Sequence, residues 1–200
     1  MGYSFIDLET TGLDHETDQI IEVAIINTDD RVEKELSSIS FLVKLNDERT
    51  LSPTITKLTG ITEDMLKTKG LPYEVMADLV RRMTKGRTIV AQFASFDLGF
   101  LKDIIQPDTF YCTRTISYIT NPNENPGLSH TCKRLRIKHK RKHWAYYDAL
   151  AVKDLFKYYL TTIGMNGITI FKNKLADTDK RPLPYIPKNA IILNFKTKEV

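Results

Sequence analysis

The sequence contains little cysteine and no long hydrophobic run. Its 200 residues include only two cysteines, Cys112 and Cys132, too few for a disulfide framework or a cysteine-based zinc site. No segment approaches the roughly 18 apolar residues of a membrane span, and a strand-like segment begins just after Met1, where a signal peptide would lie. We therefore expect a cytoplasmic protein with reduced cysteines and no membrane contact.

A large excess of one charge is also absent, but the positive charges are clustered. The net charge is only +4, yet the segment 133–142 consists mostly of lysine and arginine. Such a cluster attracts polyanions, and its phosphate contacts raise affinity without reading base sequence. We expect it to bind nucleic acid through Lys138, Lys140, Arg141 and Lys142, whereas the simpler interpretation is a solvated basic loop.

Two carboxylates interrupt the apolar segment at the N-terminus. Asp7 and Glu9 stand two residues apart among Phe5, Ile6 and Leu8, and side chains two apart on a strand point the same way. Two buried carboxylates on one face repel each other unless a cation neutralises them. We interpret them as metal ligands, because their apolar neighbours disfavour an exposed edge strand.

Two more acids follow similar apolar segments, Asp97 at the end of 88–97 and Asp148 within 143–150. Carboxylates without a cysteine or histidine cluster favour hard divalent ions such as Mg²⁺ or Mn²⁺. His143 precedes Asp148 by five residues, and an imidazole is suited to proton transfer near neutral pH. No such spacing supports the other histidines, which are His15, His130 and His139.

These residues form three motifs in a fixed order, namely Asp7-x-Glu9-Thr10-Thr11-Gly12, then Ala94-Ser95-Phe96-Asp97-x-x-Phe100-Leu101, then His143-x-x-x-x-Asp148-Ala149. The set resembles the DEDDh 3′→5′ exonucleases, the DnaQ-like family that includes the proofreading subunit of bacterial DNA polymerase III. The segment 52–62 is also similar to that subunit, so the resemblance covers roughly residues 3–160.

The resemblance implies a ribonuclease-H-like fold, in which helices flank a central five-stranded mixed sheet. It also implies two-metal phosphodiester hydrolysis that releases 5′-mononucleotides from 3′ ends. Asp7 would bridge both ions, Glu9 and Asp148 would hold the catalytic ion, and Asp97 would hold the second. His143 would take the proton from the attacking water.

Substrate contacts follow from the same resemblance. Thr10 and Leu13 would touch the terminal nucleotide, and Phe96 would pack against the 3′ end or, as readily, belong to the core. The chain departs from the family at Gln92 and Phe93, where histidine and asparagine are frequent. This departure affects substrate preference and rate rather than the metal ligands.

Hydrophobic periodicity predicts an α/β domain over residues 1–162. We expect strands over 3–9, 19–27, 38–45, 88–92 and 109–112, and helices over 73–83, from Asp97 onward, over 128–135 and over 147–160. Residues 163–200 are expected to be an appendage. Its two predicted strands, Ile168–Phe171 and Ala190–Phe195, would form a hairpin on the core or a contact surface for a partner.

Three functions fit the sequence. The first is a DNA 3′→5′ exonuclease, acting alone or beside a polymerase. The second is an exoribonuclease acting on RNA ends or short oligoribonucleotides, because the same motifs serve both substrates. The third, a non-catalytic nucleic-acid-binding module, is disfavoured because all five catalytic positions hold competent residues. The likeness to the polymerase III subunit favours DNA.

Overall fold

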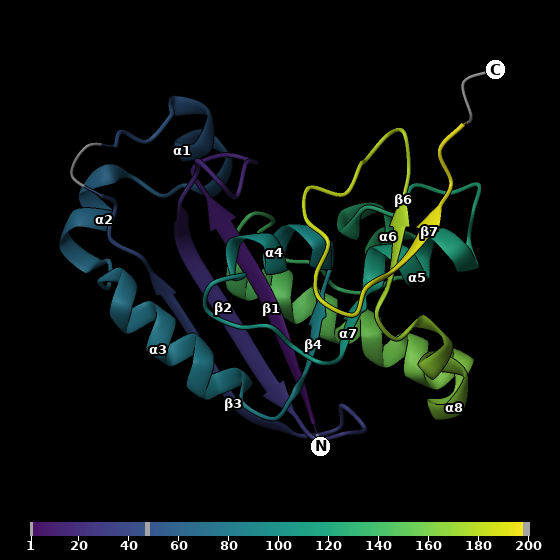
Figure 1. Ribbon diagram of the computed structural model, residues 1–200. Coiled ribbons are helices and arrows are strands. Elements are labelled where there is room, and N and C mark those ends of the chain that lie inside the picture. The colour runs from purple at the N-terminus through teal and green to yellow at the C-terminus, as the bar shows by residue number, and fades with distance from the viewer. Residues whose placement is uncertain (1, 47–48, 198–200) are drawn as a thin grey trace.

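A mixed five-stranded sheet forms the centre of the protein (Figure 1). The computed structural model describes residues 2–46 and 49–197. The sheet has the order β3-β2-β1-β4-β5, in which β1–β3 are antiparallel neighbours while β4 and β5 run parallel to β1. The strands are β1 (Tyr3–Thr10), β2 (Ile20–Thr28), β3 (Glu35–Leu42), β4 (Thr88–Ala91) and β5 (Phe110–Cys112). The predicted five-stranded mixed sheet is confirmed.

Three helices carry the chain from β3 to β4 and make the parallel pairing with β1 possible. They are α1 (Pro53–Thr59), α2 (Glu63–Lys69) and α3 (Tyr73–Thr84), and only α3 was expected. The side chains of Ser52 and Thr62 cap the first two helices. Gly60 ends α1 with a φ of 76°, a conformation that glycine adopts without strain.

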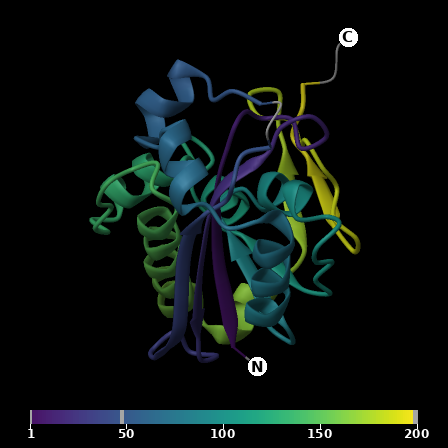
Figure 2. The ribbon, with the colours of Figure 1, turned by 90° about the vertical axis from the view of Figure 1, so that its left-hand side faces the viewer.

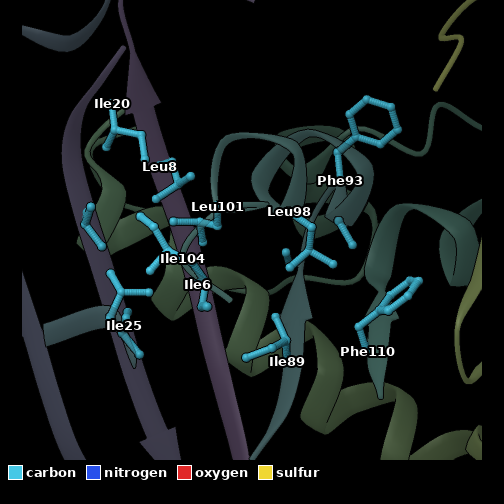
Figure 3. Packing of buried hydrophobic residues seen from close by; sticks show 14 of the residues in the cluster. Ile6, Leu8, Ile20, Ile25, Ile89, Phe93, Leu98, Leu101, Ile104 and Phe110 are labelled. Atoms are coloured by element: carbon cyan, nitrogen blue, oxygen red, sulfur yellow. The ribbon is translucent and has the colours of Figure 1, made fainter. Parts of the chain in front are cut away.

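Helices cover both faces of the sheet (Figure 2). On one face, α3 and α4 (Ala94–Phe100) pack against β1 and β4 through buried residues such as Ile6, Leu8 and Leu98 (Figure 3). On the other face, α7 (Ala145–Ile163) packs against the same strands. Two shorter helices, α5 (Thr113–Thr120) and α6 (Leu128–Arg134), precede α7. Within the described ranges, no helix has the length and apolar composition needed to cross a membrane.

The alternation of side chains along β1 decides where its acids point. Ile6 and Leu8 belong to the cluster beneath α3 and α4, whereas Phe5 packs against Phe156 of α7. Residues two apart on a strand share a face. Asp7 and Glu9 therefore continue the α7 side of β1, at the end of the strand where the apolar packing stops.

Several predicted boundaries require correction. Helix α4 begins at Ala94 rather than at Asp97, and the helix α5 was not expected. The predicted strand over 168–171 is wrong, because this segment forms α8 (Met165–Ile168) and the 3₁₀-helix η1 (Thr169–Phe171). Ile168 and Phe171 are both buried, and a spacing of three residues suits one face of a helix better than one face of a strand.

The C-terminal strands are β6 (Lys174–Asp177) and β7 (Ile191–Asn194). They pair in parallel, so they do not form the expected hairpin. The segment packs on the core, since Leu175 is buried in the same cluster as Leu98. Ser95 in α4 donates a hydrogen bond to the Tyr185 carbonyl (2.5 Å) and accepts one from the Tyr185 amide (3.1 Å). The boundary at residues 162/163 stays a prediction.

Candidate active site

Four carboxylates from three elements converge at one edge of the sheet. Asp7 and Glu9 lie on β1, Asp97 lies in α4 and Asp148 lies in the first turn of α7. Burial raises the pKa of Asp7 well above its ordinary value, and the charges of Asp148, Asp97 and Glu9 raise this pKa further. The fold thus brings together all four acids that the sequence motifs identified.

Three of these acids are buried and Asp7 is partly buried. Glu9, Asp97 and Asp148 are 9%, 5% and 8% exposed. Burial raises the pKa of Glu9 to about 8 and that of Asp97 to about 7. In the described part of the chain, no lysine or arginine forms an ion pair with any of the four. A set of oxygen ligands with this much uncompensated charge can hold divalent metal ions.

His143 lies at the edge of this cluster. A ring nitrogen of His143 and carboxylate oxygens of Glu9 and Asp148 all lie within 4.8 Å of one another. The His143 amide donates a hydrogen bond to Asp148 Oδ2 (3.1 Å), and its φ is 60°. A left-handed conformation at a residue other than glycine persists only where the surroundings hold it. The backbone of His143 is therefore held beside the acids, while its imidazole is accessible to solvent.

His139 also contacts the cluster, contrary to the expectation that it is incidental. Its Nε2 donates a hydrogen bond of 2.5 Å to Asp148 Oδ1, and its side chain is only 6% exposed. Both oxygens of Asp148 thus have a partner, one from His139 and one from the His143 amide. The sequence of the basic segment did not distinguish His139 from the other histidines. Its contact with Asp148 depends on the path of the loop between α6 and α7, which the sequence alone does not show.

Glu22 is a fifth acid near the site. It lies opposite Glu9 in the β1–β2 pairing, and its Oε2 accepts a hydrogen bond from the Ala145 amide (3.1 Å) at the start of α7. Burial raises its pKa, and its own charge raises the pKa of Asp7 and Glu9. A sequence signal was present, because Glu22 interrupts an apolar run just as Asp7 does.

The predicted nucleotide contacts have different environments. Thr10 is buried, and its hydroxyl donates to the Gly12 carbonyl (2.5 Å). Leu13 is 67% exposed in the turn after β1. Phe96 is partly buried and packs against Phe100, with ring centroids 4.9 Å apart. Leu13 is free to touch a ligand, whereas the other two side chains already have structural contacts, and all three assignments stay predictions.

The basic residues predicted to bind substrate lie in the loop between α6 and α7. This loop leads directly into His143. All four side chains are exposed, and within the described ranges none forms an ion pair with a carboxylate. They are Lys138, Lys140, Arg141 and Lys142. Their charge is therefore available to an anionic ligand next to the acids.

Curated relatives share most of this chain. It is 34% identical over 192 residues to the PolC-type DNA polymerase III of Bacillus cereus (strain ATCC 14579), an alignment that covers 88% of this chain and 12% of that relative. It is 33% identical over 175 residues to the PolC-type DNA polymerase III of Bacillus subtilis (strain 168), with 83% and 12% covered. The chain thus spans only a small part of the length of these relatives.

Solved structures share the fold. Escherichia coli Exonuclease I in complex with a dT13 oligonucleotide superimposes with a TM-score of 0.73 at 21% identity, covering 81% of this chain and 41% of that chain. Exonuclease X in complex with 5′ overhanging duplex DNA gives a TM-score of 0.67 at 24% identity, covering 84% and 97%. The predicted ribonuclease-H-like fold is confirmed. Residues 4–156 match the exonuclease family model of the RNase T type. This chain therefore belongs to the exonuclease family, in the DnaQ-like group that its motifs resemble.

Proposed function

We propose that this chain is a metal-dependent 3′→5′ exonuclease that hydrolyses the terminal phosphodiester of DNA and releases 5′-mononucleotides. The observation that carries the proposal is the convergence of three buried carboxylates and the partly buried Asp7 beside an accessible imidazole. Hydrolysis of a phosphodiester requires stabilisation of negative charge and removal of a proton from water. The carboxylates can hold ions that stabilise the negative charge, and the imidazole can accept the proton.

Asp7, Glu9, Asp97 and Asp148 would hold two divalent ions, Mg²⁺ or Mn²⁺. The fit rests on carboxylate oxygens that are largely shielded from solvent and that have no lysine or arginine partner among the described residues, and on the raised pKa of Asp7, Glu9 and Asp97. When bound, such ions polarise the phosphoryl oxygen and stabilise the attacking and leaving oxygens. The acids remain in place because rigid elements carry them, two on β1 and one each on α4 and α7.

Side chains next to the four acids hold them in position and accept the proton of the attacking water. His143 accepts the proton of the attacking water, since its ring lies beside Glu9 and Asp148 and is open to solvent. His139 and the His143 amide fix the orientation of Asp148 through its two oxygens. Glu22 ties the start of α7 to β2 through the Ala145 amide.

DNA is the proposed substrate because the chain resembles part of DNA polymerases and the fold of nucleases solved with DNA oligonucleotides. The same likeness suggests that the domain acts on 3′ ends beside a polymerase. RNA is the alternative substrate, because ions held by the carboxylates would act on the phosphodiester that both polymers share.

The test is degradation of 5′-labelled single-stranded DNA, duplex DNA and RNA of equal sequence, with Mg²⁺ or Mn²⁺. We expect stepwise shortening from a free 3′-hydroxyl, release of 5′-mononucleotides, inhibition by a 3′ block, and loss of activity with chelator or in Asp7→Ala. Cleavage of circular DNA, indifference to the 3′ block, or full activity of Asp7→Ala would contradict the proposal. Faster degradation of RNA than of DNA would select the exoribonuclease.

Metal should stabilise the protein most at high pH. The pKa of Glu9 is raised to about 8 and that of Asp97 to about 7, whereas unfolded carboxyls titrate near about 4. A raised folded-state pKa contributes stability that is present below about pH 4 and lost as pH rises towards about 8. The metal-free protein should therefore lose on the order of a few kcal/mol of unfolding free energy across this window. Added Mg²⁺ should raise the Tm more at pH 8 than at pH 5.

Thermal denaturation of Asp7→Asn and of Asp103→Asn provides the comparison. Asp7→Asn should raise the metal-free Tm at pH 8 and reduce the gain from Mg²⁺, because it removes one charge from the repulsive cluster. Asp103 is exposed outside the cluster, so its variant should behave as wild type. An equal Mg²⁺ effect in all three proteins would disprove the assignment of the metal ligands.

Replacing His143 should slow turnover more than it weakens binding. In His143→Ala we expect kcat to fall roughly 10²-fold or more with little change in KM, because the base acts only in the transition state. Steady-state kinetics on one labelled oligonucleotide measures both constants. His139→Gln is the comparator, and it should chiefly raise the Mg²⁺ concentration needed for half-maximal rate, since His139 orients Asp148. Equal kcat in wild type and His143→Ala would exclude it as the base.

The basic loop should supply a salt-dependent part of substrate affinity. We expect replacement of Lys138, Lys140, Arg141 and Lys142 by glutamine to weaken binding and to reduce the slope of log K against log salt by up to about 3, because each phosphate contact releases counterions. Fluorescence anisotropy of a labelled oligonucleotide measures both. A matched control removes four exposed charges elsewhere, those of Arg81, Lys85, Lys157 and Lys172. Equal slopes in both variants would identify the loop as merely solvated.

A further inference from the structure

An aromatic and cationic cluster stands beside the acids, and among its residues only Arg141 was given a role above, as a phosphate contact. Trp144, the one tryptophan of the chain, follows His143 directly and is 43% exposed. The Arg141 guanidinium lies 4.9 Å from the centroid of the Trp144 ring and 5.8 Å from that of Tyr147. The two aromatic rings are 6.3 Å apart. We call Arg141, Trp144 and Tyr147 the aromatic platform.

The loop presents this platform in a fixed conformation. Arg141 has a φ of 41° and His143 a φ of 60°, so left-handed residues stand on both sides of Lys142. Such conformations are costly for residues other than glycine and persist at positions that the surrounding structure fixes. Trp144 occupies the N-cap position of α7 without a capping side chain. Its side chain is exposed, although exposure of a large apolar ring to water is unfavourable.

The platform adjoins the candidate metal ligands. Trp144 and Asp148 are four residues apart, and the Asp148 amide donates to the Trp144 carbonyl (3.1 Å). Residues with this spacing lie on the same face of a helix. Trp144 thus lies about one helical turn, roughly 5 Å, before Asp148, and Tyr147 directly precedes Asp148 in the chain. The exposed lysines of the loop lie next to it along the chain.

We propose that the aromatic platform stacks the bases that lie immediately 5′ of the terminal nucleotide in a single-stranded substrate. This inference rests on the proposed exonuclease function and specifies how its site holds the strand. Every nucleobase has a π-face that stacks on an indole, and Arg141 adds a cation–π contact from the loop. The lysines bind phosphates while Trp144 binds bases, so the two contacts differ in salt dependence.

This platform would make the enzyme select unpaired ends. Bases inside a duplex already stack on their neighbours, so they reach Trp144 only after the end has opened. DNA and RNA present the same π-faces, so stacking alone does not separate them. Trp144 is thus assigned the preference for single-stranded over duplex substrates. Any preference between DNA and RNA is assigned to other contacts.

The experiment uses the fluorescence of the single tryptophan. In the Asp7→Asn background, where the substrate is expected to stay intact, single-stranded DNA, single-stranded RNA and blunt duplex DNA are each titrated with Mg²⁺ present. Binding is followed independently by anisotropy of a labelled oligonucleotide. We expect both single strands to quench Trp144 emission and to protect it from acrylamide, and the duplex to do so less.

Three variants in the same background test affinity. Trp144→Ala should bind single strands about tenfold or more weakly at every salt concentration, without a change in salt slope. Trp144→Phe retains a stacking ring and should recover most of the affinity. Tyr158→Ala removes an exposed aromatic ring further along α7 and should bind as the background does. Circular dichroism confirms that each variant is folded.

The outcomes separate this inference from the proposed function. Oligonucleotide binding and 3′→5′ degradation with unchanged Trp144 emission would overturn the stacking role alone. Equal affinity of the background and Trp144→Ala would do the same. If Trp144→Phe binds as weakly as Trp144→Ala, the affinity depends on the indole N–H and not on stacking. This result would also overturn the stacking role. Absence of both binding and degradation in the wild type would overturn the exonuclease proposal and the platform with it.

Discussion

Repulsion among buried carboxylates is the constraint around which this structure is organised. Asp7, Glu9, Asp97 and Asp148 lie close enough to raise the pKa of Asp7 through their charges, and burial raises it most of all. An isolated cluster of this kind would favour movement of the acids apart or into solvent. It persists because each acid is attached to an element that is fixed by packing elsewhere.

Two apolar clusters provide that attachment from opposite faces of the sheet. One joins β1 and β4 to α3 and α4, and thereby fixes Asp97 against β1. The other joins β1 and β2 to α7, and thereby fixes Asp148. Because β1 contributes to both clusters, its acids stand where the two meet. The C-terminal segment adds to the first cluster through Leu175 and through the hydrogen bonds between Ser95 and Tyr185.

The sequence was sufficient to predict the sheet and the four acids. Period-two alternation and interrupted apolar runs locate Asp7 and Glu9 on one face of a strand, and this information is local. The roles of Glu22 and His139 depend on pairing between β1 and β2 and on the path of the loop before α7, which are not local. The segment 168–171 was mistaken for a strand because short apolar runs have no decisive period. The parallel pairing of β6 with β7 likewise depends on tertiary contacts.

The N-terminus of α7 unites these observations. Its helix dipole favours negative charge in the first turn, where Asp148 lies, and the Ala145 amide donates to Glu22. The loop that enters this terminus brings His139, His143 and Trp144 to Asp148 within a few residues. One short segment thus carries a candidate metal ligand, the residue that orients it, the candidate base and an exposed aromatic ring. Because the same backbone positions all four, a change in the loop conformation would alter the proposed metal binding, proton transfer and strand contact together.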